Sequence, residues 1–188
     1  MLYLDEHIFD FDLPAALNSI SQQRREQALH FRFELGQRQC VLAYMLLKKG
    51  LQQEYGICDN PLFRYGPHGK PLLADHPDIH FSLSHCREAV ACAVGSKPVG
   101  VDVESVREYK EMLVNYTMNK RETEQIMSDR RPAAAFTRLW TMKEAALKLS
   151  GEGIGDNIKN VLEHCEHLRF TTTADPQQRY FCTLCEEL

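Results

Sequence analysis

The chain has 188 residues, a length that fits one domain or two small subdomains with a shared core. Its composition, 44% hydrophobic and 26% charged, is that of an ordinary globular protein. The formal net charge of −4, from 22 basic and 26 acidic residues, argues against a broad nucleic-acid-binding surface. No segment is apolar over a length that spans a membrane, and the acidic N-terminus is unlike a secretory signal, so we expect a cytoplasmic protein.

The N-terminal region predicts one strand followed by helices. Residues 2–11 partly alternate apolar and acidic positions, which indicates an edge strand. Asp12 is placed to cap a short helix that has Pro14 in its first turn. A broadly apolar helical pattern over residues 34–49 is expected to end at Gly50.

Basic groups that could meet an anion occur at two places in this half. The helical patterns contain four arginines: Arg24, Arg25, Arg32 and Arg38. Such residues normally form solvated helix surface, and anion binding is the alternative. Residues 65–71 are rich in glycine and proline and predict a turn with Lys70 at its tip. The glycines let a ligand approach the backbone, and Lys70 could meet a phosphate as a point charge.

Two extended segments follow the turn and predict a hairpin in the core. The first ends in Ser84 and His85, and the second, over residues 88–95, is a run of small apolar residues. A single histidine at a strand end is more often structural than catalytic, although both roles are open here.

Residues 99–103 predict a strand that carries two carboxylates on one face. The two-residue period sends Val101 and Val103 to one side and Asp102 and Glu104 to the other. By strand rise the two acidic positions are roughly 6.6 Å apart, which is close enough to share a divalent cation. The alternative is a half-exposed strand with a solvated acidic face.

The stretch over residues 133–155 predicts the central helix of the chain. Pro132 precedes it and Gly151 stands where a helix usually ends. Trp140, Glu144 and Lys148 recur every four residues and therefore share one side of the helix. Taken alone, this pattern fits a core tryptophan followed by a surface Glu–Lys pair, but the acidic strand upstream favours a shared site.

The remaining segments are a polar helical region over residues 109–129 and two strand-like runs, 167–173 and 179–185, separated by a turn at Asp175 and Pro176. A weak boundary near Pro98 divides the chain into halves, residues 1–98 and 99–188. We expect these halves to be subdomains of one compact unit.

Seven dispersed cysteines, an odd number, are typical of reduced cytosolic thiols. Cys182 and Cys185 form a CxxC that follows His164, Cys165 and His167, so a zinc site is conceivable. Because the surrounding pattern is that of a strand rather than a zinc knuckle, we expect small buried thiols instead.

Three of the acidic residues, Asp102, Glu104 and Glu144, have no arginine beside them in this reading and suit a hard cation such as magnesium. Magnesium commonly binds through substrate phosphates, which the basic turn, the Ser-His segment and the arginine-bearing helix could hold. The residues therefore predict a site for a phosphate-rich small molecule with a transferable or cleavable phosphoester.

Three motifs also resemble a known family. GVDVE at residues 100–104 and WTMKEAALK at residues 140–148 are similar to the two signature motifs of the 4′-phosphopantetheinyl transferases. GKPLLADHPDIHFSLSHC at residues 69–86 resembles the GKP and F-x-x-SH segments of the surfactin-synthetase-activating branch. The similarity runs in order from about Gln23 to Gly153, and the tail beyond residue 155 matches only in pattern.

The resemblance implies an α+β fold in which two similar subdomains, related by a pseudo-twofold axis, hold the active site between them. It implies that the phosphopantetheine arm of coenzyme A moves to a serine hydroxyl of an apo acyl or peptidyl carrier protein, with magnesium, releasing 3′,5′-ADP. It also favours a monomer. From the net charge and the lack of a long apolar segment, we expect the protein to bind neither nucleic acid nor a membrane.

The resemblance further implies roles for individual residues. Magnesium would be bound by Asp102, Glu104 and Glu144, and Asp102, Glu144 and Lys148 would be catalytic. Glu144, or a metal-bound water that it holds, would be the base, and Lys148 would contact the diphosphate and protonate the departing phosphate. The coenzyme A site would comprise Arg24, Gly69, Lys70, Pro71, Ser84, His85 and Lys148. Trp140 would pack and fix the helix.

Four positions differ from the family pattern. Arg24 stands where the family has a lysine for the 3′-phosphate and keeps the charge, whereas Gln27 replaces a second lysine nearby. Arg38 fits a basic position only after a one-residue gap, and Ser82 stands where an asparagine is common. We expect a weaker phosphate contact at Gln27 and only a structural effect at Ser82. The rival functions are a magnesium-dependent phosphohydrolase that acts on a nucleotide-like diphosphate and a non-catalytic module that binds coenzyme A or a carrier protein.

Overall fold

The computed structural model describes residues 1–153, 155 and 157–188. Ile154, which belongs to the stretch of residues 133–155 singled out in the sequence, lies outside the described residues. The elements of the first half are β1 (Leu2–Asp5), α1 (Leu13–Ser19), α2 (Gln22–Leu29), α3 (Glu34–Tyr55), β2 (Phe63–Tyr65), β3 (Pro71–Leu73), β4 (His80–His85) and β5 (Val90–Gly95). Those of the second half are β6 (Val99–Ser105), α4 (Glu111–Thr117), α5 (Lys120–Ser128), α6 (Pro132–Ser150), the 3₁₀ turn η1 (Ile158–Asn160), β7 (Leu168–Ala174) and β8 (Tyr180–Glu187).

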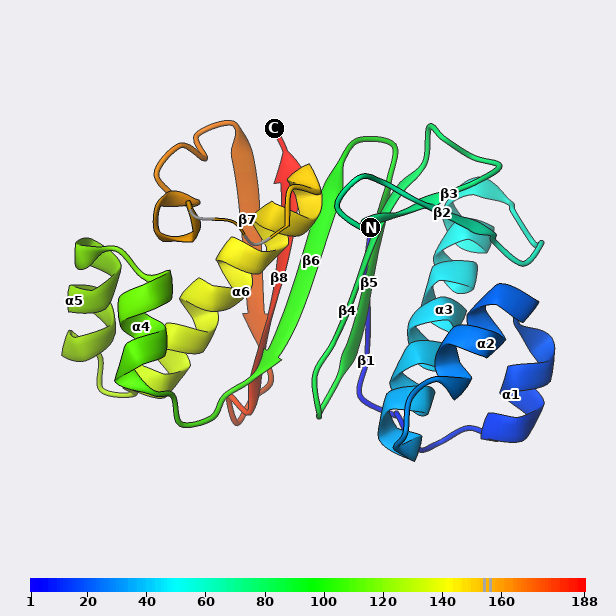
Figure 1. The fold of residues 1–188 in the computed structure, drawn as a ribbon, viewed down its shortest axis with the longest axis horizontal. Helices are drawn as coiled ribbons and strands as arrows, with labels where there is room; N and C mark the ends of the chain where they lie inside the picture. The colour runs from blue at the N-terminus through cyan, green and yellow to red at the C-terminus, as the bar shows by residue number, and fades with distance from the viewer. Residues whose placement is uncertain (154, 156) are drawn as a thin grey trace.

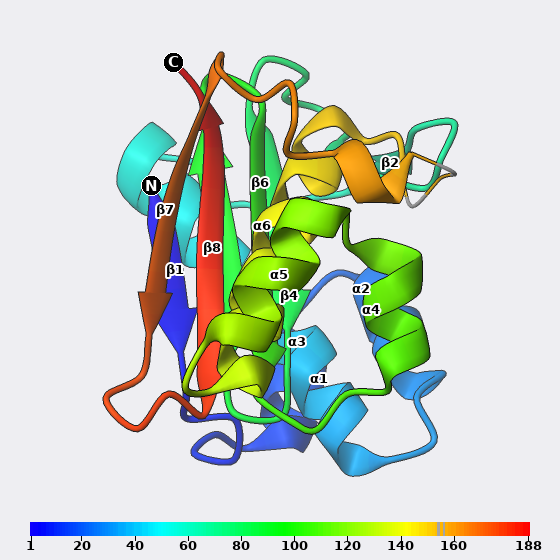
Figure 2. The ribbon, with the colours of Figure 1, turned by 90° about the vertical axis from the view of Figure 1, so that its left-hand side faces the viewer.

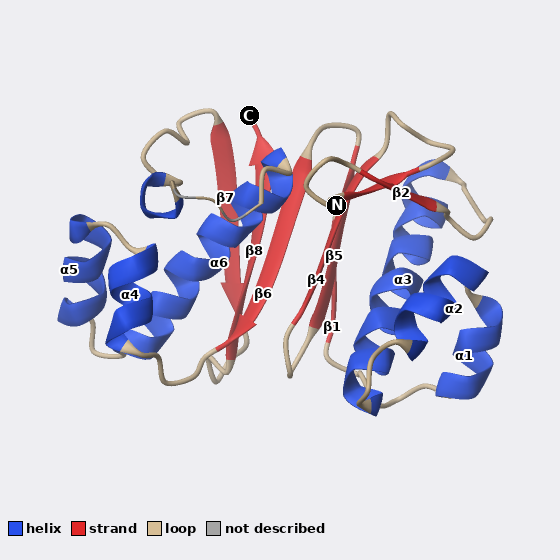
Figure 3. Ribbon diagram, viewed as in Figure 1, coloured by secondary structure: helices blue, strands red, loops and turns tan. Residues whose placement is uncertain are grey.

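Two antiparallel sheets lie next to each other in the middle of the molecule, and helices cover their outer faces (Figure 1, Figure 3). One sheet has the strand order β1-β5-β4 and the other β6-β8-β7, while β2 and β3 form a separate hairpin. Turning the molecule by 90° shows the β6-β8-β7 sheet in front of β1 (Figure 2). The arrangement confirms the predicted α+β class. In the described part of the chain, no helix is both long enough and apolar enough to cross a bilayer.

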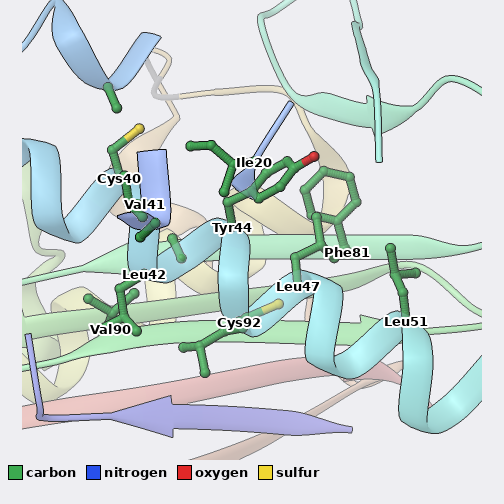
Figure 4. Close-up of a cluster of buried hydrophobic side chains, with 14 of the residues drawn as sticks. Ile20, Cys40, Val41, Leu42, Tyr44, Leu47, Leu51, Phe81, Val90 and Cys92 are labelled. Carbon is green, nitrogen blue, oxygen red and sulfur yellow. The ribbon is translucent and has the colours of Figure 1, made fainter. Parts of the chain in front are cut away.

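The first half is built around α3, which packs on β4 and β5 (Figure 4). Its inward face is apolar over several turns, so burial against the sheet stabilises a helix that would be marginal alone. The core side chains drawn from this helix and its surroundings include Val41, Tyr44, Leu47, Leu51, Phe81, Val90 and Cys92. Their burial fixes the position of β4, the strand that carries Ser84 and His85.

The helix expected to end at Gly50 continues to Tyr55, so that prediction is wrong. The chain leaves α3 at Gly56, which has a left-handed φ of 70°. Gly50 has a packing role instead, because a Cβ there would lie 2.9 Å from the Tyr3 ring and 2.9 Å from a Val94 methyl. The close contact accounts for the glycine at position 50, whereas the left-handed conformation that ends the helix is at Gly56.

Two other N-terminal predictions hold with adjusted bounds. Asp12 caps α1 by accepting the amide hydrogen of Ala15 at 3.1 Å, and a proline stands in its first turn. The edge strand exists, but it is limited to β1, because the chain turns away after Asp5 and buries Ile8 in the core. The β4–β5 hairpin is also confirmed, with His80 paired to Gly95 and His85 to Val90.

The second half is organised by the contact of α6 with β6. The helix begins at Pro132 and ends at Gly151, whose φ of 77° is left-handed, as the sequence predicts. Its Ala145 carbonyl and Leu149 amide pass directly over Gly100, where a side chain would have no room. Because β6 alternates, Val101 and Val103 face the other sheet, and the alternate positions face α6. This close approach sets the distance between the acidic strand and the Glu/Lys helix.

Candidate functional site

A buried hydrogen-bond network joins β4, β6 and α6 at the junction of the two sheets. Lys148 Nζ donates to Asp102 Oδ1 at 2.6 Å and to Ser84 Oγ at 3.0 Å. Ser84 Oγ in turn donates to Asp102 Oδ1 at 2.8 Å. Asp102 is 2% exposed, so its charge is balanced mainly by the Lys148 ammonium. The sequence placed these three groups in one site, and the structure brings them into direct contact.

The second oxygen of Asp102 is the one buried side-chain oxygen or nitrogen that lacks a hydrogen-bond partner among the described residues. A buried carboxylate oxygen without a donor is costly, because water has been removed and nothing replaces it. Such an atom is the kind of ligand that a hard cation accepts. Asp102 therefore has one oxygen engaged by the protein and one available to a ligand.

Glu104 and Glu144 lie near enough to Asp102 for its negative charge to act on both of them. Burial, followed by the charge of Asp102, raises the pKa of Glu104 to about 7. Burial and Asp102 also raise the pKa of Glu144, although Lys148 opposes the shift. Arg107 lies 3.7 Å from Glu104, and its charge lowers the pKa of that carboxyl. The expectation that no arginine is near these carboxylates is therefore wrong.

The donor set fits a divalent cation such as magnesium, on two observations. Asp102 has a buried unpartnered oxygen, and burial together with the charge of Asp102 raises the pKa of Glu104 and of Glu144, so a bound cation would favour the charged form of both. Over the described ranges, no three His, Cys, Asp or Glu side chains are already gathered as a metal cluster. The carboxylates are thus neighbours that a cation would draw together, with Lys148 as the competing positive group on Asp102.

The raised pKa of Glu104 makes folding stability depend on pH. The pKa rises from 4.5 to about 7 on folding, so the native state holds a proton that the unfolded chain releases. Without divalent metal, we expect the stability of the wild type to fall as the pH rises from about 4.5 to about 7, by at most about 3 kcal/mol. Urea unfolding in chelator should show a smaller decline for Glu104→Gln. If the free energy of unfolding changed with pH in the same way in both proteins, the pKa of Glu104 would not be raised on folding.

A cavity of about 220 Å³ opens beside the network, between the Gly-Lys-Pro turn and α6. Its walls include residues 68–71 of the turn, residues 81–83 of β4, and Glu144 and Lys148 of α6. Gly69 in the turn has a φ of 81°, a conformation that favours glycine. The turn and the carboxylate-bearing helix thus face one another across a single cavity, although the two are more than seventy residues apart.

Lys70 fastens the turn to the end of α6. Its Nζ donates to the Leu149 carbonyl at 2.7 Å, and its stem lies against Gly151. The partial loss of water lowers the pKa of Lys70. A cation at a helix C-terminus is favourable because the last carbonyls have no partner within the helix. The ammonium therefore lies at the cavity wall, with one of its hydrogens committed to the helix.

Arg24 lies inside the protein, so the reading of this arginine as solvated helix surface is wrong. Its Nε and Nη2 donate to the Cys40 carbonyl at 3.1 and 2.8 Å, and Nη1 donates to Gln27 Oε1 at 2.9 Å. Gln27, one of the departures from the family pattern, is thus a partner of Arg24. Loss of water around His85 lowers its pKa, and the nearby positive charges of Lys148 and Arg24 lower it further.

Arg38 is held by its surroundings as well. Its Nε lies 2.8 Å from Glu34 Oε1 and its Nη1 donates to the Phe11 carbonyl at 2.9 Å. The guanidinium also stands over the rings of Phe9 and Phe11. These contacts give Arg38 a structural function.

Trp140 and the CxxC pair have packing roles. Trp140 is half-buried and stacks on Phe136 with ring centroids 6.4 Å apart. Cys182 is buried between the two sheets, whereas Cys185 packs under α6, on the opposite face of β8. Positions three apart on a strand face opposite ways, so the two thiols do not converge on a zinc ion.

Lys143 is a residue that the sequence reasoning did not single out. It precedes Glu144 on α6 and is fully buried, and its Nζ lies 2.8 Å from Glu122 Oε2. The same ammonium donates to the Ile158 and Lys159 carbonyls at 2.9 and 2.7 Å. Its three hydrogens tie α6 to α5 and η1. One faint indication of this role lies in the sequence. Lys143 adjoins Glu144 in a helix, where neighbouring side chains point to different sides, so Lys143 does not share the side that carries Glu144.

Comparison with known proteins follows the same motifs. Residues 98–186, from β6 through β8, match the 4′-phosphopantetheinyl transferase superfamily. The acidic strand and the Glu/Lys helix both lie inside this match. The second half of the chain is therefore similar to the 4′-phosphopantetheinyl transferase superfamily.

Its relatives include the surfactin-type branch that the sequence motifs resemble. It is 32% identical over 144 residues to the 4′-phosphopantetheinyl transferase psf-1 of Bacillus pumilus, covering 75% of this chain and 62% of that protein. It is 26% identical over 156 residues to the 4′-phosphopantetheinyl transferase Sfp of Bacillus subtilis strain 168, covering 81% and 70%. A further Bacillus subtilis 4′-phosphopantetheinyl transferase is 25% identical over 200 residues, covering 98% and 89%. The matched part is thus less than two thirds of the psf-1 length.

Proposed function

We propose that this chain transfers the 4′-phosphopantetheine arm of coenzyme A to a serine hydroxyl of an apo acyl or peptidyl carrier protein, in a magnesium-dependent reaction that releases 3′,5′-ADP. The observation that carries the proposal is the contact of Asp102 with Lys148, beside Glu104 and Glu144. These residues lie within the part of the chain that matches the family. The match to the family and the activity named for its relatives support the same reaction.

In this proposal Asp102, Glu104 and Glu144 hold the magnesium ion. The bound cation would neutralise the charge that develops on the coenzyme A diphosphate. The unpartnered oxygen of Asp102 and the mutual repulsion of the carboxylates support this assignment.

Proton transfer is assigned to two residues of α6. Glu144 accepts the proton of the carrier serine, whose oxygen then forms the new bond to phosphorus. A raised pKa favours this role, because a more basic carboxylate takes a proton more readily. Lys148 lies at the cavity wall and gives a proton to the departing 3′,5′-ADP. The bond between the phosphorus and the oxygen of the leaving group breaks in the same step.

Coenzyme A would lie along the cavity between the turn and α6. Gly69 and Pro71 shape its adenine side. Lys70 contacts a phosphate by replacing its hydrogen bond to the Leu149 carbonyl with one to a phosphate oxygen. Arg24 and His85 would hold further phosphate charge, and Arg24 retains guanidinium hydrogens beyond those given to Cys40 and Gln27. We also propose that residues 1–98 and 99–188 act as two subdomains of a cytoplasmic monomer, with the transfer site between them.

The proposal is tested by the dependence of product formation on the acceptor. The protein is incubated with coenzyme A and magnesium, with and without an apo carrier protein, and 3′,5′-ADP is measured by chromatography. If the reaction is transfer, 3′,5′-ADP forms only when the apo carrier protein is present. Release of the nucleotide at the same rate without a carrier would indicate a phosphohydrolase and overturn the proposal.

Lys148→Ala should lower kcat more than it weakens coenzyme A binding. A group that donates a proton to the leaving phosphate acts mainly in the transition state, so we expect kcat to fall about a hundredfold. Binding of coenzyme A should weaken by less than tenfold, as measured by calorimetry. Lys120→Ala, at the exposed start of α5, is the control and should behave as the wild type. A loss of affinity with unchanged kcat would remove the acid role.

A further inference from the structure

Lys148 and Asp102 form an ion pair whose two partners differ in their freedom to move. The Asp102 side chain is 3% exposed and stands on β6, so its carboxylate is held in place. The Lys148 side chain is 31% exposed and lines the cavity between the Gly-Lys-Pro turn and α6. A lysine ammonium is carried on a flexible four-carbon stem and can turn away, whereas a buried strand residue cannot. Lys148 is therefore the partner that can leave this ion pair.

Lys148 is also the cation that acts on all three carboxylates of the site. Its Nζ lies 2.6 Å from Asp102 Oδ1, and its charge opposes the rise in the pKa of Glu104 and of Glu144. Arg107 is 3.7 Å from Glu104, but its side chain is 78% exposed, so water and salt screen its charge. Of these two cations, Lys148 is the less exposed and therefore the stronger counter-ion.

On the basis of the proposed function, we infer that Lys148 is the resident counter-ion of the metal-free site and moves from Asp102 to a coenzyme A phosphate on binding of a divalent cation. An ammonium and a divalent cation at one carboxylate repel each other, most strongly where little water screens them. Coenzyme A in the cavity that Lys148 lines would give the ammonium a new partner, because its phosphates are anions. The same movement frees the Ser84 hydroxyl, which accepts a hydrogen from Lys148 in the ion-paired state. The metal-free protein thus has no uncompensated buried charge at Asp102.

Removing the charge of Lys148 should therefore strengthen metal binding. A side chain that helps to build a metal site weakens binding when it is removed, whereas a competing counter-ion strengthens it. Lys148→Met removes the ammonium and keeps most of the volume, and Lys148→Arg keeps the positive charge. Lys120→Met is the matched control, because it removes an ammonium at the exposed start of α5, away from the residues that line the cavity.

The first titration uses the full chain without coenzyme A, in a buffer alkaline enough to keep the carboxylates charged. Paramagnetic resonance of free Mn²⁺ gives the dissociation constant. We expect Lys148→Met to bind Mn²⁺ about tenfold more tightly than the wild type, because one positive charge beside the ligands is gone. Lys148→Arg and Lys120→Met should stay within about twofold of the wild type, since the first keeps the charge and the second removes a screened one.

The second titration repeats the measurement with saturating coenzyme A, corrected for the Mn²⁺ that free coenzyme A binds. If a phosphate takes Lys148 from Asp102, coenzyme A removes a repulsion in the wild type that is already absent in Lys148→Met. The gain in Mn²⁺ affinity on adding coenzyme A should therefore be larger in the wild type, by a factor of about five or more.

Unchanged or weaker Mn²⁺ binding by Lys148→Met in the first titration would overturn the inference. An equal gain on adding coenzyme A in both proteins would also overturn it, because Lys148 would then have stayed on Asp102. If Lys148→Met does not fold, Lys148→Gln, which keeps a hydrogen-bond donor without the charge, replaces it under the same criteria. A wild type that modifies no carrier would refute the proposed function, while the first titration would still decide whether Lys148 competes with the metal.

Discussion

Asp102→Asn is expected to abolish phosphopantetheine transfer, by at least about a thousandfold, while the protein remains folded. Asparagine keeps the shape of the side chain and an oxygen that can accept hydrogen from Ser84 and Lys148. It removes the negative charge that pairs with Lys148 and the buried oxygen suited to a cation. The charge serves the proposed site rather than the apolar core, so the chemistry should suffer far more than the stability.

The measurement combines turnover with a thermal melt at saturating magnesium. Glu144→Gln should give a similar loss, because it removes both a proposed metal ligand and the proposed base. Glu108→Gln changes an exposed carboxylate just beyond β6 and should retain full activity. Near-normal turnover of Asp102→Asn with magnesium would show that the mechanism is wrong.

Gly100→Ala is expected to destabilise the fold by about 3 kcal/mol or more, or to prevent folding. A Cβ at this position would overlap the Ala145 carbonyl oxygen and lie 2.6 Å from the Leu149 nitrogen. Both atoms belong to the backbone of α6, which has no rotamer with which to move aside. The helix would have to withdraw from β6, and this would also separate Glu144 and Lys148 from Asp102.

Urea unfolding followed by circular dichroism measures this effect. Gly66→Ala is the control, because Gly66 lies in the Gly-Lys-Pro turn with its nearest neighbour, the Lys70 carbonyl, 3.7 Å from an added Cβ. It should change the free energy of unfolding by less than about 1 kcal/mol. If Gly100→Ala were as stable as the wild type, α6 would not pack on β6 as closely as the structure has it.

The sequence was informative wherever a local pattern determines the structure. The end of α6 at Gly151, the cap at Asp12 and the alternation of β6 follow from rules that act over a few residues. The spacing of Glu144 and Lys148 predicted a shared helix side, and both do line the same cavity. Helix-end prediction failed at Gly50, because the sequence alone does not show that Tyr3 and Val94 crowd that position.

The rest depends on contacts between distant segments. Arg24 is buried because the Cys40 carbonyl of another helix accepts its hydrogens, and no pattern around Arg24 indicates this. The bond from Ser84 to Asp102 joins two strands of different sheets, so spacing alone assigned Ser84 no partner. Lys143 is a third case, since its partners lie on α5 and η1. These residues decide how the site is held, whereas the motifs decide which groups are in it.

If the acidic groups of β6 and α6 act on coenzyme A to modify a carrier protein, the mass of that carrier increases. The wild type is incubated with coenzyme A, magnesium and an apo carrier protein, and the intact carrier is measured by mass spectrometry. We expect the mass of one phosphopantetheine to be added at a single serine, and none to be added in chelator or by Asp102→Asn. Across a panel of apo acyl and peptidyl carriers, unchanged masses for every carrier would show that the proposed transfer is wrong.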